Sequence, residues 1–330
     1  MLNRLARNAH LALLCGALLF PAALTRAAQP EGGYPSKPVR LVVPFPAGAS
    51  SDVVGRLIGQ KLSEQLGQQV VADNRPGAGG NLGIGMAAKS PPDGYTIVIA
   101  TASIAVSPAL YAKLGYDAQK DLVPVARLTS IPNILLVHPS VPAKTLRQFI
   151  ELARAQPGKL NFGSGGAGTT NHLANELLKH LAKINLVHVP YKGVTQAMVS
   201  MMSGEVDEVV MPVSTALTHI RSGKVRPLAV LTDERIAVLP DVPTGREAGV
   251  DGFTMPLWYG MFAPAGTPPE IVSRLSRELI AGLESADLRK RLLALSVQPW
   301  PGTAAELGQL LRADMQRYGE IARGAGLQKQ

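Results

Sequence analysis

Several features are scarce in this chain, and each absence excludes a class of chemistry. Among its 330 residues the single cysteine is Cys15, which lies close to the N-terminus. The rest of the chain therefore offers no thiol nucleophile and no thiolate ligand for a metal, and an oxidising compartment would not affect it. No Gly-x-Ser-x-Gly segment occurs, since Gly48-Ala49-Ser50-Ser51-Asp52 departs at its last position. The nucleophile elbow of a hydrolase is therefore not predicted.

Metal-site spacing is also missing. The histidines are six, and none belongs to a His-Glu-x-x-His pattern. His172 and Glu176 are four residues apart on one predicted helix, but two groups are too few for a site, and a surface pair is the simpler interpretation. His172 either packs its helix or lies at the lip of a cleft. We expect no metal, no cofactor and no catalytic residue.

The charge distribution excludes another class of partner. Lys and Arg number 33 against 24 Asp and Glu, for a net charge of +9. No block of like charge and no interleaving of basic and aromatic residues indicates nucleic-acid binding. The modest basic excess is compatible with an anionic ligand.

The N-terminus has the layout of a secretory signal peptide. Arg4, Arg7 and His10 precede an apolar run over residues 11–24, and small residues follow at 25–28. This run is shorter than the roughly 20 residues that span a bilayer. Leu14 stands where a lipoprotein signal needs a small residue before Cys15. We therefore predict a signal peptide over residues 1–27, cleaved after Ala27 or Ala28, no lipid anchor, and a periplasmic location.

Hydrophobic periodicity predicts an α/β fold. Short apolar runs, beginning with residues 39–45, alternate with helical patterns, beginning with residues 51–66, as far as residue 231. This order favours parallel sheets with helices on both faces. After a strand at 259–262, three helical patterns cover residues 271–283, 288–295 and 304–321. Met198, Met201 and Met202 are predicted to lie in the core.

No strand is predicted between or after the three C-terminal helices, so these helices must pack on a sheet formed by earlier parts of the chain. They are most simply accommodated by one lobe built from residues 35–131 and 255–330, with a second lobe, residues 132–254, inserted between. Strand-like crossings near Ile131 and Met255 would form a hinge beside a central cleft. Two consecutive domains remain the alternative.

Two loops have the composition of anion-binding turns. One covers residues 44–52, and the other covers residues 163–170. Each follows a predicted strand and leads into a helix, where ligands of open parallel sheets bind. Small residues allow backbone N–H groups to approach a ligand, and a helix start favours negative charge. One such loop in each lobe predicts a cleft that holds an anion from both sides.

The second loop also resembles nucleotide-binding motifs, but incompletely. Gly163, Gly165 and Gly168 match a dinucleotide fingerprint, yet the next strand ends in Val189-Pro190-Tyr191 without the acidic residue that the motif requires. Thr169 stands where a P-loop has lysine. Nucleotide binding is therefore not expected.

Taken together, these and further motifs resemble the Bug solute receptors associated with tripartite tricarboxylate transport. The resemblance covers nearly the whole chain after the leader, in order. It is carried by Pro44-Phe45-Pro46-Ala47-Gly48 with Asp52, Asn74-Arg75-Pro76-Gly77-Ala78-Gly79-Gly80-Asn81, Pro92-Asp93-Gly94-Tyr95-Thr96, Gly163-Ser164-Gly165 with His172-Leu173 and Glu176, Val189-Pro190-Tyr191-Lys192-Gly193, Arg226-Pro227-Leu228-Ala229-Val230, Pro240-Asp241-Val242-Pro243-Thr244 and Ala263-Pro264-Ala265-Gly266-Thr267-Pro268.

The resemblance implies a two-lobed periplasmic-binding-protein fold, each lobe a sheet flanked by helices, with a hinge and a central cleft. It implies a carboxylate, aromatic-acid or amino-acid ligand held largely by backbone amides, hydroxyls and waters. The residues expected to bind the ligand lie in the two loops and at the ends of neighbouring strands: Phe45, Ala47, Gly48, Ala49, Ser50, Asp52, Thr101, Ser103, Ser164, Gly165, Gly166, Ala167, Thr169, His172 and Met211.

This chain departs from the family pattern at two informative places. Gly48-Ala49 replaces a frequent Gly-Gly, and Met211-Pro212 stands where members often carry an acidic residue. An acid there could pair with a ligand ammonium, so its absence favours a plain or aromatic acid over an amino acid.

The expected protein is thus a monomeric periplasmic solute-binding protein. It would capture a small organic carboxylate for a tripartite tricarboxylate type transporter or sensor in the membrane. An exported hydrolase or isomerase that uses the same cleft is the alternative, and a scaffold or adhesion protein is a third possibility.

Overall fold

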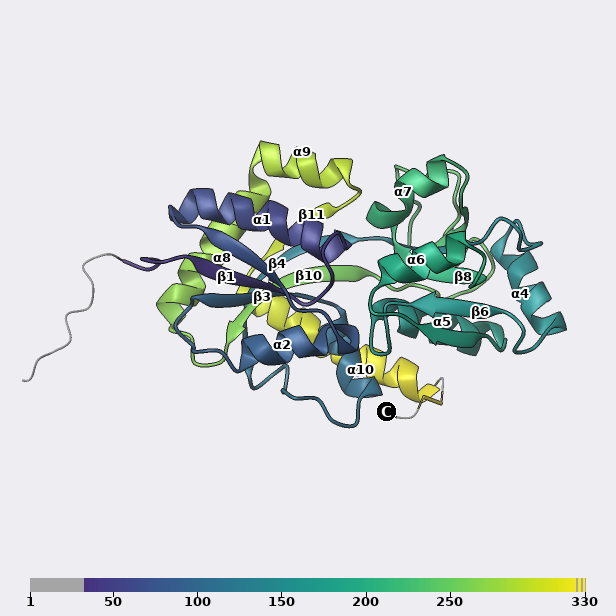
Figure 1. Ribbon diagram of the computed structural model, residues 1–330, viewed down its shortest axis with the longest axis horizontal. Coiled ribbons are helices and arrows are strands. Elements are labelled where there is room, and N and C mark those ends of the chain that lie inside the picture. The colour runs from purple at the N-terminus through teal and green to yellow at the C-terminus, as the bar shows by residue number, and fades with distance from the viewer. Residues whose placement is uncertain (1–32, 325, 328, 330) are drawn as a thin grey trace, which may run out of the picture. The chain divides into compact units, whose positions relative to one another are not determined.

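The computed structural model describes residues 33–324, 326, 327 and 329 (Figure 1). The predicted signal peptide of residues 1–27 and Cys15 lie outside the described residues. The described residues from Pro35 onwards form one compact unit. Within the described residues, no helix combines the length and the apolar character that crossing a bilayer requires.

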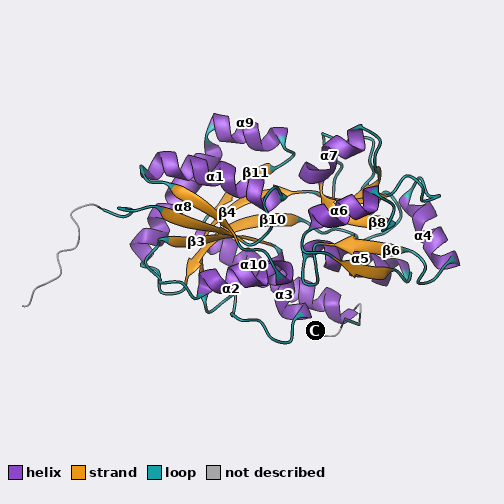
Figure 2. Ribbon diagram, in the orientation of Figure 1, coloured by secondary structure: helices purple, strands orange, loops and turns teal. Residues whose placement is uncertain are grey.

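The first of two sheets in the described chain takes strands from both ends of the sequence (Figure 2). Its strand order is β11-β4-β10-β3-β1-β2. The strands are β1 (Val39–Val43), β2 (Val70–Asn74), β3 (Thr96–Thr101), β4 (Leu122–Ile131), β10 (Leu257–Pro264) and β11 (Gln298–Gly302). β1 is parallel to β2 and β3, whereas β10 is antiparallel to both β3 and β4.

The second sheet has the order β7-β6-β8-β5-β9. It consists of β5 (Asn133–Val137), β6 (Asn161–Ser164), β7 (Val187–Pro190), β8 (Glu208–Pro212) and β9 (Arg226–Val230). β6 is parallel to β7 and β8, and β5 is antiparallel to β8 and β9. The expected parallel sheets are therefore mixed. Most strands of each sheet are parallel, as predicted, but β5, β10 and β11 are antiparallel to the strands beside them. β5 and β10 are the first strands after each passage between the sheets.

The chain passes between the sheets at two adjacent places. Between β4 and β5 lies the single residue Pro132. The return passage runs through Met255, whose carbonyl accepts a hydrogen bond from Asn133 Nδ2 at 3.0 Å. Leu231 N also donates to the Asn133 carbonyl at 2.8 Å. The two passages are thus joined by hydrogen bonds.

Helices cover both faces of the first sheet (Figure 1). α1 (Ser50–Leu66), α8 (Pro269–Glu284) and α9 (Ala286–Ala294) pack together on one face, while α2 (Asn81–Ala88), α3 (Ser103–Leu110) and α10 (Ala304–Gly324) lie on the other. The 3-10 turn η1 (Ala78–Gly80) precedes α2. Every residue of β3 and β10 is buried, as expected for strands covered on both sides.

Strand alternation sets the two faces of the second sheet. Val209 and Met211 pack with Met198 and Met201 of α6 (Val194–Met202) in a hydrophobic cluster that also includes residues of α7 (Val213–Arg221). Phe162 points instead to His172 of α5 (Thr170–Ala182). α4 (Leu146–Ala155) completes the described helices of this part. The core role predicted for Met198 and Met201 is confirmed.

Besides the 3-10 turn η1, the sequence patterns missed two α-helices and two strands of the described chain, and proline explains three of these four. Pro108 lies inside α3, Pro124 lies inside β4, and β11 contains Pro299 and Pro301. Proline lacks an N–H donor and weakens both helix and strand signals. In β4, Pro124 lies opposite Phe262 beside a register shift, where the ladder is already irregular. The fourth missed element, α7, begins directly after β8 without a capping side chain.

Candidate functional site

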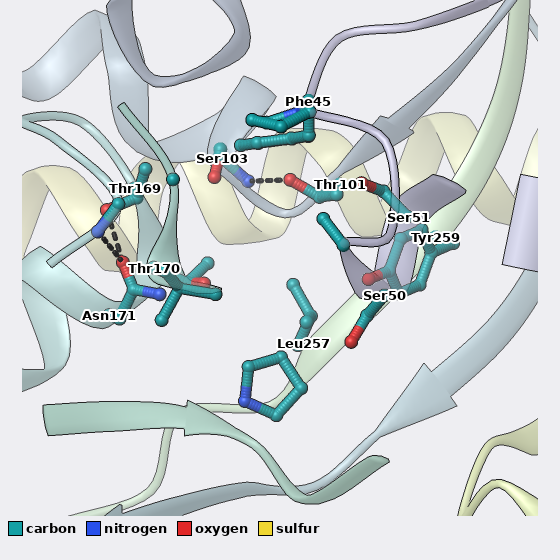
Figure 3. Close-up of a pocket in the computed structure, with 16 residues that line it drawn as sticks. Phe45, Ser50, Ser51, Thr101, Ser103, Thr169, Thr170, Asn171, Leu257 and Tyr259 are labelled. Atoms are coloured by element: carbon teal, nitrogen blue, oxygen red, sulfur yellow. Dashed lines mark hydrogen bonds between the residues drawn. The ribbon is translucent and has the colours of Figure 1, made fainter. Parts of the chain in front are cut away.

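A pocket opens where residues of both sheets and their loops meet (Figure 3). Its cavity volume is about 50 Å³. Its wall combines small and hydroxyl-bearing side chains with apolar ones. The lining residues are Phe45, Pro46, Ala49, Ser50, Ser51, Thr101, Ser103, Gly165, Thr169, Thr170, Asn171, Gly193, Val194, Pro212, Leu257 and Tyr259.

The starts of five helices of the described chain reach this pocket. Ser50 and Ser51 begin α1, and Thr170 and Asn171 begin α5. The pocket wall also holds the first residues of α3 and α6 and the residue that precedes α7. The first N–H groups of a helix have no acceptor within it, and the helix dipole makes that end positive. The arrangement therefore favours a bound anion.

Charged side chains are absent from the lining residues of the described chain. The single titratable group among them is the phenol of Tyr259, whose pKa is raised by burial and lowered less by a hydrogen bond with Ser50. This hydroxyl therefore remains a neutral donor at physiological pH. Attraction for an anion must come from N–H groups and hydroxyls, and no Lys or Arg of the lining supplies it.

A charged network holds the first loop from behind. The buried Asp52 carboxylate accepts hydrogen bonds from Gly48 N at 2.9 Å, Arg56 Nε at 2.9 Å and Asn74 Nδ2 at 3.0 Å. Burial alone raises the pKa of Asp52, but these donors outweigh it and lower the pKa below its ordinary value. Gly48 adopts a φ of +80°, in the left-handed region that glycine tolerates.

A network of uncharged groups holds the second loop. Gly166 N donates to Ser164 Oγ at 3.0 Å, and Gly165 N donates to Asn171 Oδ1 at 3.3 Å. The Thr169 hydroxyl donates to the Gly166 carbonyl at 2.7 Å, and the same Oγ1 accepts a weak bond from His172 N at the start of α5. Two of the loop N–H groups predicted to hold the ligand are thus used within the loop, which leaves the helix starts as the better donors.

Hydrogen bonds also join the two sides of the pocket. Ser50 Oγ lies 2.6 Å from Thr215 Oγ1 and 3.0 Å from Ser214 Oγ, both in the first turn of α7. Tyr111, which follows α3, donates its hydroxyl proton to the Ala167 carbonyl at 2.7 Å. These contacts tie the first-sheet elements directly to the second loop and to α7.

Seven of the residues predicted from the sequence line the pocket. They are Phe45, Ala49, Ser50, Thr101, Ser103, Gly165 and Thr169. Six other predicted residues belong to the same loops but do not line the pocket: Ala47, Gly48, Asp52, Ser164, Gly166 and Ala167. Hydrogen bonds among them, such as Gly48 N to Asp52 and Gly166 N to Ser164, hold the loops in place.

Two further predicted residues lie beneath the site. Met211 is fully buried in the hydrophobic cluster, and because side chains alternate along a strand its neighbour Pro212 reaches the pocket instead. His172 is buried and stacks on His188. Its predicted role in helix packing, one of the two interpretations left open, fits this position.

The sequence reasoning missed several lining residues. Pro46, Ser51, Thr170 and Asn171 are direct neighbours of predicted ones. Gly193 ends the Val189-Pro190-Tyr191-Lys192-Gly193 motif and Val194 begins α6 directly after it. The rule that ligands lie where helices begin could therefore have found both. Tyr259 follows Trp258 on β10, and successive side chains of a strand point to opposite faces of the sheet. Because Trp258 Nε1 donates to Asp314 of α10 at 2.6 Å, Tyr259 points to the face opposite α10.

Catalytic and metal-binding arrangements do not emerge at the pocket. No cluster of three or more metal-ligating side chains occurs among the described residues. A serine–histidine pair exists, with Ser164 Oγ 2.6 Å from His188 Nε2, but Ser164 is fully buried and is not a lining residue. Burial, with the charge of Lys179, lowers the pKa of His188 to about 4. The geometry is suited to binding.

Comparison with known proteins agrees with this geometry. Residues 54–327 match the family model described as tripartite tricarboxylate transporter family receptor. Protein BugT of Bordetella pertussis is 35% identical over 297 residues, which cover 89% of this chain and 90% of that protein.

Two solved structures are similar over most of the chain. Rpa4515 of R. palustris with adipate has a TM-score of 0.87 and 35% identity, over 90% of this chain and 100% of that one. MatC from Rhodopseudomonas palustris with bound malate has a TM-score of 0.84 and 35% identity, over 87% of this chain and 99% of that one.

Proposed function

Because the chain belongs to the tripartite tricarboxylate transporter receptor family, we propose that it captures a small organic carboxylate in its pocket and delivers it to a membrane transporter or sensor. The observation that carries this proposal is the meeting of five helix starts at a pocket without charged side chains. The two similar structures hold adipate and malate, which are carboxylates. The fold is the two-lobed α/β fold expected from the sequence.

The residues at the helix starts define how the carboxylate would be held. N–H groups and side-chain donors are available on both sides of the pocket. Ser50 and Ser51 provide them on one side, and Thr170 and Asn171 provide them on the other. Hydrogen bonds to a charged group contribute about 1.5–3 kcal/mol each. A few of them are sufficient for micromolar binding, about −8 kcal/mol, after the entropic losses of association.

The pocket chemistry also restricts the ligand. No acidic side chain lines the pocket among the described residues, so an ammonium group would find no charged partner there. A volume of about 50 Å³ is a few times the roughly 10–15 Å³ that one water molecule needs in a cavity. Both features favour a compact carboxylate without an amino group.

The location and the working cycle are part of the same proposal. Removal of residues 1–27 would release the protein, as a monomer, into the periplasm. Residues 35–131 with 255–330 would form one lobe and residues 132–254 the other. The hydrogen-bonded passages at Pro132 and Met255 would then be the hinge. Contacts such as Ser50 with Thr215 would form and break as the lobes move.

A panel of ligands tests the proposal by thermal unfolding. Malate, adipate, benzoate, glutamate, glucose and ATP are added separately, and the melting temperature is measured. A ligand at 100 times its Kd stabilises the folded state by about 2.7 kcal/mol. We expect malate or adipate to raise the melting temperature and glucose and ATP to leave it unchanged. A shift with glucose and none with any carboxylate would contradict the proposal.

Mass spectrometry separates binding from catalysis. The protein is incubated with the stabilising carboxylate, denatured, and the released ligand is weighed. A receptor returns the ligand intact, whereas a hydrolase or isomerase returns a product or a rearranged isomer, resolved by chromatography.

Sequencing of the secreted protein should find Ala28 or Gln29 at the N-terminus; an acylated Cys15 would contradict the export proposal.

A further inference from the structure

A histidine outside the pocket is hydrogen-bonded to the second ligand loop. His188 lies on the edge strand β7, and its Nε2 is 2.6 Å from Oγ of Ser164, the last residue of β6. The same Oγ accepts the Gly166 N–H at 3.0 Å. Ser164 is fully buried, while its neighbour Gly165 lines the pocket. The imidazole is therefore two hydrogen bonds away from the backbone of the loop.

The direction of these hydrogen bonds follows from their partners. Gly166 N can only donate, so it cannot receive the Ser164 hydroxyl proton. Among the described residues, His188 Nε2 is the remaining partner of that hydroxyl. The Ser164 O–H must then donate to Nε2, which requires a neutral imidazole with its proton on Nδ1. An imidazolium would donate in the opposite direction and leave the buried hydroxyl proton without an acceptor.

The ring of His188 lies against two others. Its centroid is 4.8 Å from that of Phe162 and 4.2 Å from that of His172, and the last two centroids are 6.3 Å apart. Phe162 and His172 belong to β6 and α5, the two elements that the second loop connects. This stack of three rings therefore links the strand before the loop to the helix after it.

The surroundings keep this stack uncharged. The groups that face it are Lys179 and Glu176 of α5, whose side chains pair at 2.9 Å, and the two histidines themselves. Burial comes first in lowering the pKa of His172 to about 3, and the neighbouring His188 and Lys179 add to it. Burial first, and then Lys179, lower the pKa of His188 to about 4. Both rings are therefore neutral at the pH of the periplasm.

We propose that His188 is a positioning residue for ligand binding. As a neutral hydrogen-bond acceptor it orients Ser164, and Ser164 holds the Gly166 N–H, so that Gly165 and the first turn of α5 keep the shape that faces the ligand. This inference rests on the proposed function, because the loop is taken to contact the carboxylate. It assigns a binding role to a side chain that does not touch the pocket.

Four variants separate the hydrogen bond from the stacking and from general stability. His188→Phe keeps an aromatic ring but removes the acceptor, and His188→Gln restores an acceptor close to the position of Nε2. Ser164→Ala removes the link itself. His138→Phe is the matched control, because His138 Nδ1 also lies 2.6 Å from a serine hydroxyl, that of Ser140, at a site remote from the lining.

Two readouts keep this inference distinct from the proposed function. The first needs no ligand: hydrogen exchange of the Gly166 amide and the tautomer of His188, both measured by NMR at pH 7. The second is the Kd for malate, with adipate as a second probe, measured by calorimetry. Loss of one buried hydrogen bond, about 1–3 kcal/mol, corresponds to roughly a 5- to 150-fold change in either readout.

We expect the proton on Nδ1 of His188 in the wild-type protein. His188→Phe and Ser164→Ala should speed Gly166 exchange and weaken probe binding by about 5-fold or more. His188→Gln should stay within about 3-fold of wild type, and His138→Phe should match wild type in both readouts.

Three results would overturn the inference. They are an Nε2-protonated His188, unchanged Gly166 exchange in His188→Phe, and a His188→Phe variant that binds the probe as wild type does. If the wild-type protein binds neither probe, the proposed ligand class fails, while the exchange measurement still decides whether His188 orders the loop.

Discussion

The two loops that lead into the pocket are alike in composition but are held in different ways. Residues 44–52 are fixed by the carboxylate of Asp52, which is neutralised by Arg56 and reaches Gly48 N. Residues 163–170 are fixed by hydroxyl, amide and imidazole groups, none of them charged. One loop relies on an ion pair between the buried Asp52 and the half-exposed Arg56, and the other relies on a buried neutral network.

The difference shows how an anion site can avoid charged side chains. Asp52 does not line the pocket, and its pairing with Arg56 leaves almost no net charge at the first loop. Behind the second loop, burial keeps His172 and His188 neutral. Both supports therefore present only N–H groups and hydroxyls to the ligand, and helix dipoles provide the attraction.

The same substitution in each loop should have unequal effects. A Cβ at Gly165 would lie 3.1 Å from the backbone N of Val194, whereas a Cβ at Gly48 would meet nothing within 4 Å. Gly165→Val should therefore weaken carboxylate binding by about 100-fold or more, because the α6 start would have to move. Gly48→Val suffers chiefly from its positive φ, a strain of about 1–2 kcal/mol.

Calorimetric titration and thermal unfolding of both variants test this difference. Each should still unfold in one cooperative transition. Normal binding by Gly165→Val would show that the second loop is not crowded as the structure indicates, and the comparison between the loops would fail.

Removing the Asp52 carboxylate, which holds the first loop, should reduce the stability of the fold more than it reduces ligand binding. Asp52→Ala loses bonds to Gly48, Arg56 and Asn74, so we expect a cost of about 2–3 kcal/mol in the free energy of unfolding at pH 7. The pKa of Asp52 is lowered in the folded state, so this contribution is present above about pH 4 and is lost as the pH falls below that value. Urea unfolding at pH 7 and pH 3 measures it.

Asp73→Ala is the control for this experiment. Asp73 is also paired with arginines, Arg40 and Arg75, but its side chain is 25% exposed and lies outside the pocket lining. It should cost less stability and leave ligand binding unchanged. An equal loss in both variants would mean that Asp52 acts as an ordinary ion pair and not as the support of the first loop.

As the pH is lowered, the histidines that support the second loop should become protonated before the Asp52 carboxylate that supports the first loop. His188 titrates near pH 6.5 when unfolded but at about 4 when folded. The unfolded chain therefore binds more protons between these values, and stability that is complete above pH 6.5 falls as the pH is lowered, by up to about 1.4 kcal/mol per pH unit. His172 acts in the same direction. Asp52 keeps its charge throughout this range.

Comparison of wild type with His188→Gln at pH 7 and pH 5 isolates this contribution. The loss of unfolding free energy should be smaller in the variant by roughly 1–2 kcal/mol. Glu208 acts in the opposite direction, because burial raises its pKa in the folded state, but it is common to both proteins. Equal losses in the two proteins would show that His188 is charged or solvated in the fold.

Sequence reasoning succeeded where strand ends and helix starts coincide. Ser50, Thr101, Ser103 and Thr169 follow buried strands at the edge where helices begin, and all four line the pocket. It failed where the answer depends on which face of a strand is turned to the pocket. Met211 was among the predicted residues, but its neighbour Pro212 lines the pocket, and Tyr259 lines it without having been predicted.

Long-range pairing was also beyond the sequence patterns. The antiparallel insertion of β5 and β10 follows from the passages between the sheets, and no local periodicity records it. The hydrogen bond between Ser164 and His188 joins residues 24 apart on neighbouring strands. The motif that contains Ser164 predicted a ligand loop, but its support could be found only from the register of β6 and β7.

The smallest effects should come from the cations nearest to the two loops. Arg56 is 53% exposed on its side chain and pairs with Asp52, while Lys192 is exposed beside Gly193, and neither lines the pocket. An exposed ion pair contributes about 0–1 kcal/mol, so Arg56→Ala should change the Kd for malate or adipate by less than about 5-fold. Lys192→Ala should change it even less, and 0.5 M NaCl should have little effect on either protein.

A cation that donated directly to the carboxylate would contribute about 1.5–3 kcal/mol, a loss of roughly 10- to 100-fold on its removal. Calorimetry distinguishes these ranges, and a loss of that size in either variant would mean that the charge of a side chain, and not the meeting of helix starts, holds the anion.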